Sequence, residues 1–419
     1  MRYVIIGGGP GGIFAAEAIR RRDVDSPIVI VTEEGDIARS PVMLPYLIGG
    51  QVPREGVRFR DPSWEKENRI DLQLWRKAVA LETSSQKLIL EKGEEVPYDQ
   101  LLIATGSSPI SLPIPGGGLK GVRSIRQVSD AEAIFGAIPT LRQVVIIGGG
   151  FIGLKIASHL KERGIEVLTL EKENRLAPRM FDVQASRFLV DLLGRKGMRV
   201  ETGVEVQEIL GKGGQVCAVR MKDGRIFPGQ MVIQSVGVKP NTAFLAGSGI
   251  ALNMGIPVNP LMETNIPGVY AAGDVAVTVD SITGERTNNA TWPAASRQGT
   301  VAGTNMAGGK VSYVHNLSLN ALHLCGIPVM AAGNSSEVNG QGLVEEGPGF
   351  YRKVLLQDGR ITGFILIGKV SQAGFLLASM KKKEALSSAD LMQESFWGRK
   401  QLPQGYGYRH GSLFSEYKM

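Results

Sequence analysis

Two glycine-rich loops contain the residues of this sequence best suited to chemistry. One runs from Gly7 to Gly12 as GGGPGG, and the other from Gly148 to Gly153 as GGGFIG. Both fit G-x-G-x-x-G, whose glycines permit a tight turn, a close approach of the backbone to a pyrophosphate, and close packing of a helix on a strand. A helix after each loop would direct free N–H groups at phosphates. The pattern predicts two dinucleotide sites, at Gly7, Gly9, Pro10 and Gly12 and at Gly148, Gly150, Ile152 and Gly153.

The elements around each loop repeat in the same order. An apolar run precedes each loop, and a helical stretch and a second apolar run follow it. Residues 28–32 lead to Glu33, and residues 167–170 lead to Glu171. A carboxylate at the end of that second run can accept hydrogen bonds from ribose hydroxyls. Two such units in one chain predict two adenine dinucleotides held at once, and therefore electron transfer between them.

Length and composition fit a globular protein of two or three domains. The chain has 419 residues, of which 43% are hydrophobic and 21% charged, and this is enough for well-buried cores. Its two cysteines, Cys217 and Cys325, lie far apart, and no spacing typical of zinc or iron–sulfur ligands occurs. We expect no metal site, and we expect either cysteine to be a small buried residue rather than a redox centre.

The sequence favours a cytoplasmic protein that binds no nucleic acid. The most apolar late stretch, residues 363–378, is broken by Lys369 and Gln372, so no membrane span is expected. A strand expected to begin at Arg2 leaves no room for a signal peptide. The net charge of +7 would suit an acidic partner such as a small electron-carrier protein, although scattered solvated lysines and arginines would give the same total.

The first 240 residues read as one module used twice. Residues 1–112 predict β-α-β, a hairpin over residues 87–96, and a strand at 101–104 that ends in Thr105-Gly106. Residues 113–240 repeat this plan, with a hairpin turn at 222–224 and a strand at 231–234 that ends in Val236-Gly237. This repetition indicates an internal duplication of a nucleotide-binding module and an α/β fold.

The last hundred residues have a different pattern. Alternating strands at 351–356 and 361–366 are joined by Asp358-Gly359, a strong hairpin turn, and a helix is expected over residues 373–385. Residues 395–419 lack periodicity and would lie over the surface or a partner. We predict a third, α+β domain from residue 316 onward.

Four motifs, in order, then identify a family. Besides the two loops they are Ala104-Thr105-Gly106 and Ala272-Gly273-Asp274. The chain resembles FAD-dependent pyridine nucleotide-disulfide oxidoreductases, in the branch of NADH oxidases, rubredoxin and ferredoxin reductases and the flavin part of NADH-dependent nitrite reductases. The resemblance implies two Rossmann-like domains of the glutathione-reductase type and a C-terminal α+β domain. It implies FAD in residues 1–112 and 241–315, NAD(P)H in residues 113–240, and a homodimer through residues 316–419.

The resemblance also assigns roles around the flavin. Asp274, after Gly273, matches the aspartate that binds the flavin ribitol. Residues 291–299 match a stretch whose helix N-terminus would face the flavin and stabilise negative charge on it, and Trp292 within it would pack by the ring. Phe151 matches an aromatic that covers the flavin until nicotinamide enters; ordinary packing is the alternative for both aromatics. The remaining cofactor contacts implied by the motifs are Glu33, Ala104, Thr105, Gly106 and Gly237.

Two departures from the family pattern bear on mechanism. Relatives carry a redox cysteine in a segment that reads here from Arg39 to Gly50 as RSPVMLPYLIGG, and the aligned position is Val42. Valine cannot form a thiolate, so disulfide reduction through that position is excluded. The glutamate that usually follows the second loop is replaced by Lys155, which would place positive charge beside the reduced flavin or be a solvated helix residue.

The expected reaction is therefore direct hydride transfer from NADH to FAD. Stacked rings need positioning rather than a side-chain acid or base. Glu171 favours NADH because a carboxylate repels a 2′-phosphate, whereas Lys172 leaves NADPH possible. The acceptor we expect is a protein electron carrier such as rubredoxin, ferredoxin or an iron–sulfur subunit. Alternatives are an NADH oxidase that reduces dioxygen, a regulatory FAD/NAD-binding flavoprotein, and the flavin subunit of a larger dehydrogenase.

Overall fold

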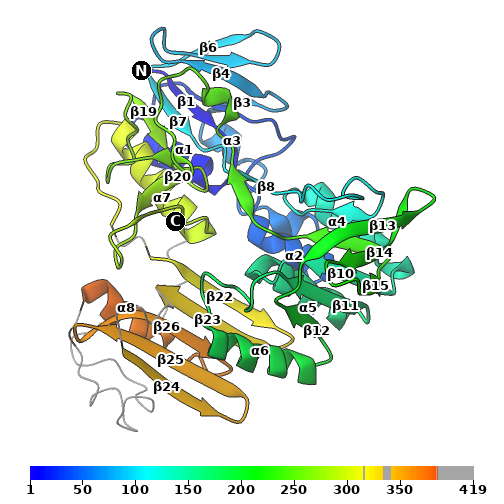
Figure 1. Ribbon diagram of the computed structural model, residues 1–419. Helices are drawn as coiled ribbons and strands as arrows, with labels where there is room; N and C mark the ends of the chain where they lie inside the picture. Colours follow the sequence, from blue (N-terminus) through cyan, green and yellow to red (C-terminus); the bar gives the residue numbers. More distant parts are fainter. Residues whose placement is uncertain (315–316, 334–340, 384, 386–419) are drawn as a thin grey trace.

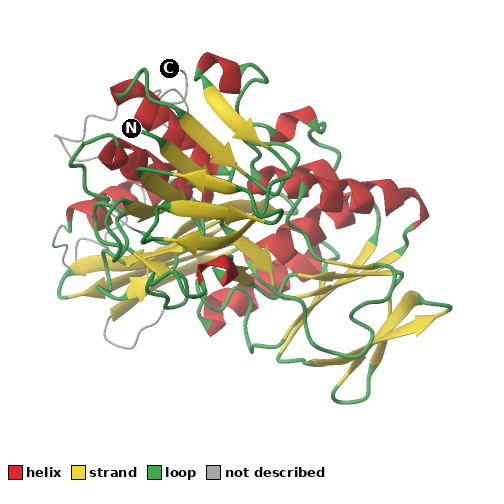
Figure 2. Ribbon diagram, turned by 90° about the horizontal axis from the view of Figure 1, so that it is seen from above, coloured by secondary structure: helices red, strands yellow, loops and turns green. Residues whose placement is uncertain are grey.

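The computed structural model describes residues 1–314, 317–333, 341–383 and 385 (Figure 1). Two parallel-sheet units and one antiparallel-sheet unit make up these residues. In the view from above, helices lie on either side of strands (Figure 2). The predicted α/β class, with two Rossmann-like domains and a C-terminal domain, is confirmed.

The first parallel sheet has the order β19-β7-β1-β2-β3. Strands β1 and β2 are short runs rich in valine and isoleucine, and they are buried along their whole length, as expected of a sheet covered on both faces. Helices α1 and α7 pack against each other beside this sheet (Figure 1). The bounds are β1 (Tyr3–Ile6), α1 (Pro10–Arg22), β2 (Ile28–Val31), β3 (Ile70–Gln73), β7 (Gln100–Ile103), β19 (Val269–Ala271) and α7 (Trp292–Met306).

The second parallel sheet repeats this arrangement with the order β12-β11-β10-β16-β9. In both sheets the strand that leads into the glycine loop lies between the next parallel strand and a later one. The bounds are β9 (Val122–Arg123), α4 (Val128–Ala137), β10 (Gln143–Ile147), α5 (Phe151–Glu162), β11 (Glu166–Glu171), α6 (Val183–Arg195), β12 (Arg199–Thr202) and β16 (Met231–Gln234).

Smaller elements join and flank the two sheets. The chain passes from the first sheet to the second and back through β8 and β17, which pair with each other in antiparallel fashion. Two three-stranded antiparallel sheets, β4-β5-β6 and β13-β14-β15, follow β3 and β12, the third strands of the repeated plan. The bounds are α2 (Leu44–Ile48), α3 (Trp64–Glu67), β4 (Ala78–Glu82), β5 (Lys87–Leu90), β6 (Glu95–Pro97), β8 (Ser107–Pro109), β13 (Val206–Lys212), β14 (Gln215–Met221), β15 (Ile226–Pro228), β17 (Val238–Pro240), β18 (Ile256–Pro257), β20 (Ala276–Val279) and β21 (Arg286–Thr287).

The C-terminal sheet is antiparallel, with the order β22-β23-β26-β25-β24. Helix α8 packs on one face through Leu376 and Met380, and side chains such as Tyr351 on the other face join the core of the second unit. The predicted hairpin at Asp358-Gly359 is confirmed, and the predicted helix ends at Lys382. The bounds are β22 (Leu319–Leu324), β23 (Ile327–Gly333), β24 (Gln341–Gly347), β25 (Phe350–Gln357), β26 (Arg360–Ile367) and α8 (Ala373–Lys382).

Several expectations concern what the chain lacks. Among the described residues, no helix is long and apolar enough to cross a membrane, and no group of three His, Cys, Asp or Glu could hold a metal ion. The predicted surface tail of residues 395–419 lies outside the described residues. The expectation that both cysteines are buried is wrong for Cys217, which is exposed, because the flanking Val216 and Ala218 point inward from β14. Cys325 is half-buried.

Candidate functional site

The first glycine loop forms a cradle that side chains would fill. Gly7 has φ +115°, and a Cβ there would lie 2.2 Å from the carbonyl oxygen of Ala104. A Cβ on Gly12 would lie 2.0 Å from the oxygen of Gly7. Nothing lies within 4 Å of a Cβ built on Gly9. The backbone is therefore closed around Gly7 and Gly12 and open above Gly9, as the approach of a pyrophosphate requires.

The second loop repeats this geometry. Gly148 has φ +111°, and its Cβ would lie 2.3 Å from the oxygen of Ser235. A Cβ on Gly153 would lie 2.3 Å from the oxygen of Gly148, and the space above Gly150 is open. Ile152, one residue into helix α5, is 54% exposed. Both loops thus fit a dinucleotide phosphate at a helix N-terminus.

The two acids singled out from the sequence do not occupy equivalent positions. The N–H of Gly7 donates to Val31 and that of Gly148 donates to Leu170, both at 2.8 Å. In this register Thr32 corresponds to Glu171, and Glu33 corresponds to Lys172. The interpretation of the acids as a matched pair was wrong, because hydrogen bonds between the strands, and not the end of the apolar run, fix the alignment.

Glu171 is also held far more tightly than Glu33. Its side chain is buried, and its two carboxylate oxygens accept hydrogen bonds from the N–H groups of Gly149 (2.7 Å) and Glu173 (2.8 Å). Glu33 is exposed. The carboxylate of Glu171 is consequently fixed directly beneath the second loop.

Asp274 lies at the carboxyl edge of the first sheet, where β19 returns beside β7. Its carboxylate accepts a hydrogen bond from the Ser107 hydroxyl at 2.9 Å. The adjacent Gly273 donates its N–H to the side-chain oxygen of Gln298 on α7, at 2.8 Å. Thr105 is tied to Asn241 by two hydrogen bonds, one in each direction. The structure therefore brings Ala104-Thr105-Gly106 and Gly273-Asp274 together, although they are far apart in sequence.

Arg126 belongs to this cluster and was missed from the sequence. One of its guanidinium nitrogens lies 3.6 Å from the carboxylate of Asp274, and another would lie 2.7 Å from a Cβ on Gly106. Burial raises the pKa of nearby Glu34, and Arg126 opposes that shift. Nothing in the local pattern marks Arg126, since its partners come from other parts of the chain. It supplies a positive charge beside the first loop's sheet edge.

Trp292 begins α7 and packs among aromatic rings. It makes edge contacts with Phe14 (5.7 Å between ring centroids) and Phe59 (5.5 Å). Thr291 caps the helix by accepting the N–H of Ala294. The positive end of the α7 dipole is thereby directed at the same sheet edge as Asp274.

Phe151 and Lys155 lie on α5 of the second unit. The Phe151 ring is half-buried and stands edge-on to Phe181 at 5.4 Å. The ammonium of Lys155 donates to the carbonyl of His323 on β22 at 2.9 Å and lies 4.5 Å above the ring of Tyr46 on α2. Lys155 therefore connects α2, α5 and the C-terminal sheet.

Val42, the position aligned with the redox cysteine of the relatives, is on the surface. Val42 is 55% exposed in a short turn that leads into α2. The two cysteines lie on other elements: Cys217 is on β14, and Cys325 is in the turn between β22 and β23, 3.3 Å from the sulfur of Met198. Gly237, the last predicted contact, precedes β17 with φ +118°.

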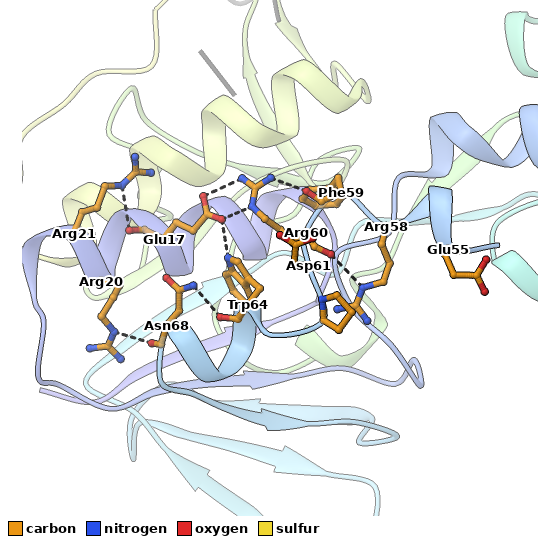
Figure 3. A pocket seen from close by; sticks show the side chains of 11 residues that line it. Glu17, Arg20, Arg21, Glu55, Arg58, Phe59, Arg60, Asp61, Trp64 and Asn68 are labelled. Carbon is orange, nitrogen blue, oxygen red and sulfur yellow. Dashed lines mark hydrogen bonds and ion pairs between the residues drawn. The ribbon is translucent and has the colours of Figure 1, made fainter. Parts of the chain in front are cut away.

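A cavity of about 870 Å³ opens beside the second half of α1 and was not anticipated (Figure 3). Its wall is rich in arginine, and several of these arginines are held by hydrogen bonds within it. Arg60 forms a two-pronged contact with Glu17, which also accepts the Trp64 indole N–H at 2.8 Å, and Arg20 donates to the carbonyl of Asn68. The cavity is separate from both glycine loops.

Comparison with known proteins agrees with the resemblance. The family model described as pyridine nucleotide-disulphide oxidoreductase matches residues 1–299, and the rubredoxin NAD+ reductase C-terminal domain matches residues 319–384. The chain is 35% identical to the NADH oxidase of Methanocaldococcus jannaschii over 75% of its own length and 71% of that protein. It is 30% identical to the epsilon subunit of NADH-dependent phenylglyoxylate dehydrogenase of Aromatoleum evansii, over 92% and 93%.

A solved structure gives the same result. The NAD-dependent persulfide reductase from A. fulgidus superposes with a TM-score of 0.88 at 26% identity, covering 93% of this chain and 78% of that one. The fold that carries the two cradles is thus shared with this solved reductase. The chain belongs to the pyridine nucleotide-disulphide oxidoreductase family, whose members are oxidoreductases that bind FAD and NAD(P)H.

Proposed function

We propose that this chain is an NADH oxidoreductase with bound FAD that reduces a protein electron carrier without a redox-active cysteine. The observation that carries this proposal is Val42: residues 39–50 contain no thiol, and both cysteines of the chain lie on other elements. A relay of electrons through a disulfide at this position has no chemical basis.

In this proposal, the first unit holds FAD. Gly7, Gly9, Pro10 and Gly12 would contact its pyrophosphate, and Asp274 its ribitol. Bound FAD would supply hydride acceptance and the release of electrons singly or in pairs. The N-terminus of α7 would stabilise negative charge at the ring, and Arg126 would orient Asp274 through their ion pair.

The second unit would hold the nicotinamide dinucleotide. The pyrophosphate would contact Gly148, Gly150, Ile152 and Gly153. The fixed carboxylate of Glu171 would accept hydrogen bonds from the ribose hydroxyls. Phe151 would cover the flavin and exclude water from it until the nicotinamide enters. Positioning is the main contribution of such residues, because hydride transfer between stacked rings needs no side-chain proton donor.

Two features support a protein as the acceptor. The C-terminal domain matches a model named after rubredoxin NAD+ reductase, and the net charge of +7 favours the approach of an acidic partner. We also expect a homodimer through the C-terminal sheet, which light scattering of the purified protein would test.

Anaerobic titration tests the input side. NADH should bleach the flavin absorbance of the FAD-loaded protein, and added rubredoxin or ferredoxin should restore it faster than dissolved oxygen does. If NADH and NADPH both leave the flavin oxidised, the proposal is wrong.

Treatment with iodoacetamide tests whether a thiol takes part. Alkylation of exposed Cys217 should leave the rate of electron transfer to the carrier unchanged. The matched control is Cys217→Ser, in which Cys325 is the remaining thiol. If iodoacetamide abolishes electron transfer in that variant, the proposal is contradicted.

One relative favours a specific alternative, an NADH oxidase that reduces dioxygen. Rapid, stoichiometric consumption of NADH with oxygen alone would establish it in place of a carrier. The relative that is a dehydrogenase subunit favours a flavin subunit of a larger enzyme, for which co-purification of a second polypeptide is the test. A regulatory flavoprotein would show a long-lived reduced flavin and slow turnover with every acceptor.

A further inference from the structure

Three charged residues, Lys172, Glu205 and Lys222, lie on segments that meet next to Glu171 at the carboxyl edge of the second sheet. Three segments meet there through backbone hydrogen bonds. The N–H of Val204 donates to the carbonyl of Glu171 at 3.0 Å, and that of Lys222 donates to the carbonyl of Glu205 at 2.9 Å. The end of β11, the turn after β12 and the end of β14 are therefore fixed side by side.

Two lysines in this group share one carboxylate. The Glu205 carboxylate lies 2.7 Å from the ammonium of Lys222 and 3.6 Å from that of Lys172. The hydrogen bond from Lys222, with further help from Lys172, holds the pKa of Glu205 below its usual range, so this carboxylate is charged at neutral pH. Both lysine side chains are more than 60% exposed, and they can reorient if the carboxylate is removed.

We propose that Glu205 determines dinucleotide specificity by holding Lys172 and Lys222 away from the 2′-phosphate of NADPH. This inference rests on the proposed function, in which the second loop binds the nicotinamide dinucleotide. The ribose 2′ position would lie at Glu171, beside these lysines. Lys172 and Lys222 are thus suited to bind a 2′-phosphate. Two carboxylates act against such binding, the buried one of Glu171 and the surface one of Glu205.

The two carboxylates should differ in strength. Glu171 is anchored by two backbone N–H groups and would repel a phosphate at close range. Glu205 forms exposed ion pairs, whose contributions are small. Its removal should therefore favour the phosphorylated nucleotide by about two- to fivefold, and the effect should fall in about 0.5 M salt because the charges are exposed to solvent.

Calorimetry with two redox-inactive ligands provides the test. The full-length, FAD-loaded protein is titrated with ADP-ribose and with 2′-phospho-ADP-ribose, as wild type and as Glu205→Gln. We expect tighter binding of the phosphorylated ligand only, by about two- to fivefold. The matched control is Glu208→Gln, which removes a carboxylate paired with Arg220 in the adjacent sheet. It should change the affinity for neither ligand.

The second variant locates the effect. Adding Lys172→Gln to Glu205→Gln should reverse most of the gain. Equal changes for both ligands, or equal effects of Glu205→Gln and Glu208→Gln, would overturn the inference. If wild type reduces its flavin with NADH but Glu205→Gln shows no selective change, the inference alone fails. If ADP-ribose does not bind at all, the nicotinamide assignment fails and the inference fails with it.

Discussion

The two glycine loops share one steric design but differ in what surrounds them. Gly7 and Gly148 adopt nearly the same φ, and in each loop the third glycine touches the carbonyl of the first. The position occupied by Thr32 in the first unit is occupied in the second by Glu171, whose buried carboxylate accepts two backbone hydrogen bonds. The backbone that accepts a pyrophosphate is thus repeated, whereas the groups that would discriminate between nucleotides are specific to each unit.

The largest expected effect comes from breaking each cradle separately. Gly12→Ala places a methyl group against the oxygen of Gly7, and Gly153→Ala does the same at Gly148, each at a cost of about 1–3 kcal/mol. Gly12→Ala should lose FAD, measured as flavin absorbance per chain. Gly153→Ala should keep FAD but lose reduction by NADH. Release of FAD from Gly153→Ala would show that the units are not independent.

A smaller effect is expected from the ion pair of Arg126 and Asp274 in the first unit. Arg126→Gln removes the positive charge 3.6 Å from the Asp274 carboxylate, and an ion pair of this kind contributes up to about 1 kcal/mol. FAD should dissociate up to about fivefold more readily, as measured by fluorescence of the released flavin. Binding of ADP-ribose should not change. Unaltered FAD affinity would remove Arg126 from the site.

The difference between Glu171 and Thr32 predicts an effect of comparable size in the second unit, on the use of NADH rather than on the binding of FAD. Glu171→Gln weakens the acceptor beneath the second loop and should raise KM for NADH by about tenfold, or about 1.4 kcal/mol, with little change in kcat. Thr32→Val, at the equivalent position, should leave KM for NADH unaltered. Steady-state kinetics with one carrier measure both. Equal changes in the two variants would contradict the register deduced from the strands.

The smallest effect is expected at Lys155. Its contacts to Tyr46 and the His323 carbonyl predict that Lys155→Met lowers the free energy of unfolding by about 0.5–1 kcal/mol, with NADH reduction nearly unchanged. Thermal denaturation and stopped-flow reduction measure the two quantities. A tenfold slower reduction at unchanged stability would instead indicate that the charge acts on the flavin.

The sequence was most informative where function depends on backbone contacts close in the chain. The glycine loops, their strands and the Asp358-Gly359 hairpin follow from local patterns and were predicted correctly. Arg126 was not found, because its relation to Asp274 depends on the return of β19 beside β7. Glu33 was aligned with Glu171 because the apolar runs end at both acids, whereas hydrogen bonds between strands set the true register. The exposure of Cys217 could have been deduced from the alternation of Val216, Cys217 and Ala218.

Helices α1 and α7 meet through their backbones, and this has a consequence for how the first unit can vary. A Cβ on Gly299 would lie 2.1 Å from the oxygen of Gly11, and one on Gly303 would lie 2.2 Å from that of Ala15. The spacing of the two helix N-termini is therefore set by main-chain atoms and hardly by the side chains around them. Outward-facing positions of both helices can change freely in evolution, while the line of contact between them tolerates almost no added volume.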